Sequence, residues 1–146
     1  PGGPTSGLPA ARTACDDVLR DAALPAGRRA EALSARASIR LYQQRDDRSA
    51  LADIDSAVAM APDQPDHRFE RARILEAMEN LPGAIAELTE TLRLFASVAA
   101  EAFGYRAVLR EEAGDLPGAV ADYGRAVAAG QAAREPADHS LLVERA

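Results

Sequence analysis

The sequence predicts an all-α fold, an α-solenoid of about three helix–turn–helix units, and three observations lead to this prediction. The segment 71–87 returns 35 residues later as 106–122, and a looser copy covers 36–53. Periods of this length are typical of stacked supersecondary units, none of which buries its apolar face alone. Alanine, the strongest helix former, accounts for 34 of the 146 residues. Apolar residues also recur at helical spacing between short polar turns.

The N-terminal part is expected to contain a lead-in and one extra helix. Residues 1–9 are rich in glycine and proline and predict a flexible segment ahead of a single folded domain, 10–146. A helix is predicted over 10–23, where small and apolar residues form one stripe. The stripe consists of Ala14, Cys15, Val18, Leu19 and Ala22. The turn formers at 24–27 end this helix.

The first unit is predicted over about 28–62. Its helices span 28–44 and 49–60, joined by a polar turn at 45–49. Pro62 closes the unit because proline cannot continue a helix.

The second and third units repeat one design. Unit two covers about 65–97 with helices at 66–79 and 82–95, and unit three covers about 99–131 with helices at 99–113 and 116–129. Asn80 and Asp115 are placed to cap the second helix of each unit. Pro82 and Pro117 follow in the first turn, where the missing N–H does little harm.

The C-terminal end is expected to close the stack. Gly130 is predicted to stop the last helix, and 135–146 to add a short capping helix. Leu141, Leu142 and Val143 would cover the open apolar end, since terminal repeats need such a cover.

Units of this length with small residues at fixed places resemble the tetratricopeptide repeat (TPR), in its bacterial form. Small residues occupy the family's positions 8 and 20: Ala37, Ala72, Ala107, Ala50, Ala84 and Ala119. Its bulky position 24 holds Ile54, Leu88 and Tyr123. The resemblance implies that the alanines are packing residues at helix crossings, where larger side chains would force the helices apart.

The chain departs from the family pattern at several places. Arg40 and Arg110 stand where the family has tyrosine, and Thr91 replaces an alanine. Unit one has one extra residue in its turn. Residues 10–24 resemble the second helix of a degenerate preceding unit.

The resemblance implies a concave face lined by the first helix of each unit, which would bind a peptide or a helix. The expected groove residues are Tyr42, Asp66, Phe69, Arg73, Glu76, Glu101, Tyr105, Val108 and Glu111. Phe69 and Tyr105 are the expected aromatic anchors, although Phe69 equally suits packing between units one and two. The family's basic clamp for a C-terminal carboxylate is missing, because its positions hold Ser34, Ser38, Glu70, Glu101 and Tyr105.

Three arginines recur with the repeat, as do three acidic residues. The arginines are Arg36, Arg71 and Arg106, and the acids are Asp53, Glu87 and Asp122. We hypothesise a structural role in which these pairs bridge adjacent helices. The alternative is a groove lined with cations for an acidic peptide.

Composition and motifs argue against several classes of function. The net charge is −6, there is no lysine, and no basic stripe suits nucleic acid. No apolar run approaches the roughly 20 residues of a membrane span, so no membrane insertion is expected. His67 and His139 have no metal-ligand partner at helical spacing, and nucleophile and phosphate-loop motifs are missing. We therefore expect no catalysis and no cofactor, and expect Cys15 to be a small buried hydrophobe.

The expected function is a non-catalytic scaffold or adaptor for a protein or peptide. The alternatives are a dedicated chaperone for a secreted or membrane partner, and a docking module of a larger enzyme or transport system. Self-association is a further expectation. The sequence begins at Pro1, which suits either a processed or a trimmed product. We expect an exported, periplasmic location, with the cytoplasm as the alternative.

Overall fold

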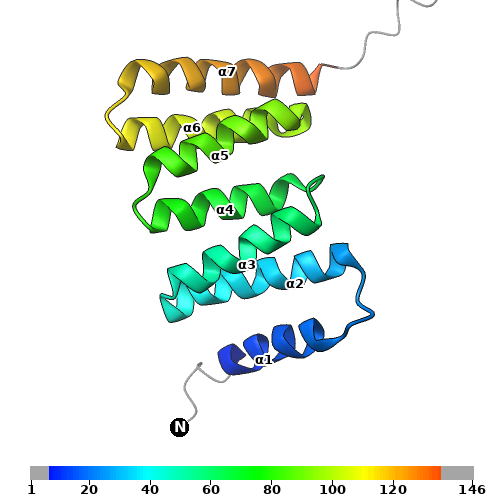
Figure 1. Cartoon of the computed structure of the whole chain (residues 1–146). Coiled ribbons are helices and arrows are strands. Elements are labelled where there is room, and N and C mark those ends of the chain that lie inside the picture. Colours follow the sequence, from blue (N-terminus) through cyan, green and yellow to red (C-terminus); the bar gives the residue numbers. More distant parts are fainter. Residues whose placement is uncertain (1–6, 136–146) are drawn as a thin grey trace, which may run out of the picture.

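The computed structural model describes residues 7–135, and over this range it contains helices and no strand. The elements are α1 (Gly7–Arg20), α2 (Ala26–Ile39), the π-helix η1 (Arg40–Gln44), α3 (Asp47–Met60), α4 (Pro65–Ala77), α5 (Leu81–Leu94), the 3-10 helix η2 (Ala96–Val98), α6 (Ala99–Glu112) and α7 (Leu116–Arg134). Figure 1 shows them stacked from α1 at one end to α7 at the other. The predicted all-α class is confirmed.

Each helix packs against its neighbours along the chain (Figure 1). The antiparallel pairs α2–α3, α4–α5 and α6–α7 are hereafter units one, two and three. The second helix of each pair also packs on the first helix of the next, and α1 packs on α2. This one-dimensional order is the arrangement expected of an α-solenoid.

The repeated alanines lie where the helices cross. All six alanines predicted as packing residues are buried, with at most 2% of their surface exposed: Ala37, Ala72, Ala107, Ala50, Ala84 and Ala119. Ala37 and Ala50 share a core cluster with Ile54 of α3, and Ala72 and Ala84 share one with Leu88 of α5. The core is therefore built as predicted, from closely spaced helices with few large side chains.

The turns of units two and three use the predicted caps. Asn80 Oδ1 accepts a hydrogen bond from the backbone N of Gly83 at 2.9 Å, and Asp115 Oδ1 accepts one from Gly118 N at 3.0 Å. A Cβ atom at Gly83 or Gly118 would lie only 2.5 or 2.0 Å from the capping side chain. Glycine is thus required by the close approach of the cap.

Unit one accommodates its extra residue in a π-helical turn, which was not predicted from the sequence. The helix predicted over 28–44 is α-helical only to Ile39 and π-helical over Arg40–Gln44. Asp46 N donates to Arg40 O, six residues back, whereas Asn80 N donates to Leu75 O, five residues back. A π-turn absorbs one inserted residue without breaking the helix.

The start of α3 also differs from the prediction. The helix begins at Asp47, two residues before the predicted 49. Asp46 Oδ1 accepts a hydrogen bond from Ser49 N at 3.1 Å and so acts as the N-cap. The aspartate inside the predicted turn, rather than its last residue, decides where the helix starts.

The first helix is displaced from its predicted bounds. α1 begins at Gly7, inside the predicted lead-in 1–9, and ends at Arg20 rather than at 23. Asp21 Oδ1 accepts a hydrogen bond from Ala23 N at 2.9 Å. This local side-chain bond competes with the helical pattern and ends the helix early.

The prediction that Gly130 stops the last helix is wrong. α7 continues through Gly130 to Arg134. The four residues after Gly130 are good helix formers, and their propensity outweighs the cost of one glycine. The capping helix predicted at 135–146 falls almost entirely outside the described residues.

One face of α7 remains uncovered by described residues. Its exposed apolar side chains are Leu116 (60% exposed), Val120 (71%), Tyr123 (41%) and Val127 (61%). Their repeat counterparts in α5, Leu81, Ile85 and Leu92, pack against the core that α5 shares with α6. Tyr123 is exposed for this reason, although Ile54 and Leu88 at the same repeat position are buried.

Candidate functional site

A pocket with a volume of about 480 Å³ lies across the first helices of the stack. Its lining residues are Tyr42 from η1, Arg73, Glu76 and Ala77 from α4, and Glu101 and Tyr105 from α6. Five of the nine predicted groove residues thus come together, along with Ala77. Each unit contributes to one continuous surface.

Tyr105 joins the core to this pocket. Its ring packs against the core between α4, α5 and α6, and its hydroxyl donates a hydrogen bond to Glu76 Oε2. Burial, followed by this hydrogen bond to a carboxylate, raises the pKa of Tyr105 above its ordinary value. The phenol therefore stays protonated and holds the Glu76 side chain in place.

The single arginine of the pocket is already paired. Arg73 Nη1 lies 3.2 Å from Glu70 Oε2, one turn away on α4. Ser38 Oγ, on α2, donates to Glu70 Oε1 at 2.7 Å. Glu70 consequently links units one and two beside the pocket and is the ion-pair partner of Arg73.

Two lining residues have free polar groups. Tyr42 is 63% exposed. Its pKa is raised above the ordinary value, mainly because its ring is partly buried and secondly because the negative charge of Glu70 is close. Glu101 is exposed at the start of α6. Neither the Tyr42 hydroxyl nor the Glu101 carboxylate forms a hydrogen bond or ion pair with the residues at 7–135. Both are available to a ligand.

Phe69 is not a groove residue, so its prediction as an anchor is corrected. Only 3% of its surface is exposed, and it belongs to the buried cluster that includes Leu88 and Ala102. Its position in the repeat suggested the concave face, but its ring fills the space where α4, α5 and α6 meet. Phe69 is thus a packing residue, but it packs between units two and three and not between units one and two as predicted.

Three further predicted groove residues lie outside this pocket. Asp66 and Val108 are exposed on α4 and α6 but do not line it. Glu111 Oε2 accepts a hydrogen bond from the Tyr123 hydroxyl at 3.0 Å, which turns it toward α7. These residues extend the surface beyond the pocket.

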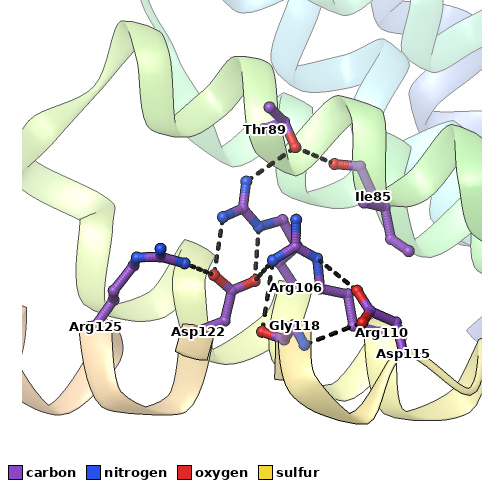
Figure 2. Close-up of polar contacts among 8 residues, drawn as sticks. All are labelled: Ile85, Thr89, Arg106, Arg110, Asp115, Gly118, Asp122 and Arg125. Atoms are coloured by element: carbon purple, nitrogen blue, oxygen red, sulfur yellow. Dashed lines mark hydrogen bonds and ion pairs between the residues drawn. The ribbon is translucent and has the colours of Figure 1, made fainter. Parts of the chain in front are cut away.

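The recurring arginines form buried clusters with the recurring acids in units one and three. In unit three, Arg106 Nε and Nη2 both donate to the Asp122 carboxylate at 2.8 Å, and Arg110 Nη1 adds a bond of 2.9 Å (Figure 2). Arg106 also donates to Thr89 Oγ1 in the preceding unit at 3.0 Å. The hypothesis that these pairs bridge adjacent helices agrees with this geometry.

Unit one repeats this arrangement almost bond for bond. Arg36 donates twice to the Asp53 carboxylate, at 2.9 and 2.8 Å, and Arg40 Nη1 adds a bond of 2.7 Å. Arg36 also reaches back to Asp16 of α1 at 2.9 Å. Each first arginine thus connects its own pair of helices to the preceding helix.

Unit two departs from the pattern. Arg71 Nη1 lies 3.4 Å from Glu87 Oε2, and its Nε lies 2.9 Å from Asp55 Oδ1 in α3. The second arginine is replaced by Leu75, and Arg68 donates to Glu87 Oε1 at 2.8 Å instead. The charge of Glu87 is thus balanced by one contact from each of two arginines.

The second arginine of each cluster was not predicted as a partner of the acid, although the sequence pattern indicates this role. Arg40 and Arg110 were noted only as departures from the family tyrosine. Their shared position, four residues after Arg36 and Arg106, places them on the same helix face and so identifies them as partners of the same acid. Arg68 leaves no such signal, because it occurs at that repeat position only in unit two.

Other chemical groups add little to the site. Among residues 7–135, no group of three His, Cys, Asp or Glu side chains could hold a metal ion. Cys15 is partly buried, and this burial raises the pKa of its thiol. None of the described helices combines the length and the apolar character needed to cross a membrane.

Comparison with known proteins supports the fold. No protein-family model and no curated protein sequence matches the chain. The solved structures that match it include two crystal structures of MamA, each with a TM-score of 0.70. One is 16% identical and covers 88% of this chain and 73% of the MamA chain, and the other is 17% identical and covers 90% and 72%. These neighbours are TPR-like all-α solenoids, so the chain has a TPR-like fold.

Proposed function

We propose that this protein is a non-catalytic scaffold or adaptor that binds a protein or peptide segment on the surface formed by its first helices. One observation supports this most strongly: the pocket collects side chains from η1, α4 and α6, which belong to three successive units. A segment lying across it would contact all three units at once. Surfaces built in this way suit extended or helical ligands.

The chemistry of the lining suits such a ligand. Tyr42 and Tyr105 offer large, rigid rings with polar ends, which are typical of the residues that dominate protein interfaces. Arg73, Glu76 and Glu101 supply charge around the rings. Apolar contact with polar orientation at the edges is the usual composition of a protein-binding patch.

Selection from a random peptide display library tests the proposal. Peptides would be selected on the wild-type protein, and their affinities measured for Tyr42→Ala and Tyr123→Ala. Tyr123 is a matched control because it is also an exposed tyrosine, but it lies on α7 and does not line the pocket. We expect Tyr42→Ala to weaken the selected peptides at least tenfold and Tyr123→Ala to change their affinity less than twofold.

Peptides that bind the wild type and Tyr42→Ala equally well would contradict the proposal. The chaperone form of this proposal makes a separate prediction, in which a native partner aggregates when this protein is removed from its host. The exported location is also a proposal, and fractionation of host cells would test it.

A further inference from the structure

We propose that the segment bound in this groove is basic, and that it places an arginine or lysine side chain against the rings of Tyr42 and Tyr105, within reach of Glu76 and Glu101. This inference rests on the proposed function, because it names the chemistry of the ligand for the same pocket. It follows from where the charges of this chain lie.

The pocket and its edge hold an excess of negative charge. Glu76 and Glu101 line the pocket, and Glu70 stands beside it on α4. Arg73 is the only cation among the lining residues, and it is paired with Glu70. Within residues 7–135, Glu76 receives a hydrogen bond only from the neutral Tyr105 hydroxyl, and Glu101 receives none. Neither carboxylate has a positive partner in this part of the chain.

The arginines that could have served an acidic ligand lie elsewhere. Arg36, Arg71 and Arg106 are bound to acids between the helices. Their guanidinium groups do not line the pocket. This pocket is therefore not lined with cations for an acidic peptide. Arg36 instead lines a separate hollow with Arg20 and Arg29, between α1, α2 and α3.

The aromatic rings complete a site for a cation. A guanidinium or ammonium group over the face of a tyrosine is attracted by the ring, and guanidinium is the more weakly hydrated of the two. With Tyr42 63% exposed and Tyr105 fixed by Glu76, the pocket offers one accessible ring and one held ring. Its volume of about 480 Å³ exceeds what one such side chain needs.

The surface next to the pocket suits the rest of a peptide. A second hollow shares Tyr42 and Ala77 and adds Leu41, Arg45 and Asp47. The charges of Arg45 and Asp47 are opposite, so this neighbour does not cancel the negative charge of the pocket. At longer range, the net charge of −6 also attracts a basic segment.

The peptides selected by display provide the test. We expect arginine or lysine to be enriched at one position, and replacement of that residue by citrulline to weaken binding at least tenfold, because citrulline keeps the shape but loses the charge. Glu101→Gln should weaken the same peptides three- to tenfold. Glu112→Gln is the matched control, since it removes an equal charge from the end of α6 without touching the pocket.

The outcomes separate this inference from the proposed function. Peptides that lose affinity with Tyr42→Ala but carry no basic residue would overturn the inference and leave the function standing. Equal losses with Glu101→Gln and Glu112→Gln would also overturn it, because net charge alone would then explain the effect. If Tyr42→Ala changes nothing, the proposed function itself fails.

Discussion

Units two and three each neutralise a buried acid in their second helix, but with different geometry. In unit three, Asp122 is fully buried and receives two parallel bonds from Arg106 and a third from Arg110. In unit two, Glu87 is 9% exposed and receives one contact each from Arg68 and Arg71. The repeat preserves a neutralised acid in the second helix of each unit but not the way in which it is neutralised.

The difference shows what one substitution does to a repeated cluster. Where unit three has Arg110, unit two has Leu75, which packs against the core instead. A bidentate pair between arginine and a carboxylate is stronger and more directional than a single contact. Unit two should therefore depend less on its ion pairs and more on apolar packing, and the following predictions test this ranking.

The largest effect is expected for Asp122→Ala. This change leaves Arg106 and Arg110 without their buried acceptor, and Arg125 loses its ion pair to the same carboxylate. Breaking a buried pair from one side typically costs about 3–5 kcal/mol, and we expect a loss in that range. Urea unfolding followed by circular dichroism measures it, with the exposed Glu112→Ala as control. A loss below about 1 kcal/mol would refute the importance of this cluster.

A smaller effect is expected for Glu87→Ala in unit two. Arg68 and Arg71 would lose one contact each, and Arg71 would keep Asp55, which lies 47% exposed on α3. We expect a loss of about 1–3 kcal/mol in the free energy of unfolding. The same urea experiment compares it with Asp122→Ala. If Glu87→Ala proves the more damaging of the two, the ranking of the units is reversed.

The next largest effect on the free energy of unfolding is expected from shortening an apolar side chain in α5 rather than its counterpart in α7. Ile85 packs against the core shared with α6, whereas its counterpart Val120 is 71% exposed on α7. Ile85→Ala should cost about 1–2 kcal/mol, since its side chain is only partly buried. Val120→Ala should stay within about 0.5 kcal/mol. Equal losses would mean that something covers α7 in solution.

The smallest effect is expected on the stability of the protein at low pH. Burial alone would raise the pKa of Asp122, but the hydrogen bond from Arg106 and the surrounding arginines hold it below the ordinary value of 3.8. Its stabilising contribution is complete above that value and is lost as the pH falls through the lowered pKa of the folded protein. Below pH 3.8 the wild type should therefore lose stability more steeply than Asp122→Asn. Parallel pH profiles would contradict this assignment.

Much of this structure could be predicted because repetition makes local signals unambiguous. The caps Asn80 and Asp115, the buried alanines and the arginine–acid pairs each recur at one repeat position, and each lies where that position suggests. Five of the predicted groove residues also line one pocket, since helix periodicity determines which side chains share a face.

The incorrect or missing predictions lie where one unit departs from the pattern that the other units share. The π-helix at Arg40–Gln44 absorbs an insertion whose location within the turn the sequence does not specify. Phe69 was misplaced because a position near the edge of a helix face can point to the groove or to the core, and only the packing of α6 decides which. Arg68 could not be foreseen, because it compensates for Leu75 from a different repeat position.

The acids between the helices bind the recurring arginines, whereas Glu76 and Glu101 in the groove have no arginine partner among residues 7–135. The most direct test maps backbone amide chemical shifts while a display-selected peptide is added. We expect the changes to centre on Tyr42, Ala77 and Glu101. Changes centred on the exposed face of α7, around Val120, with none at Ala77, would contradict this expectation.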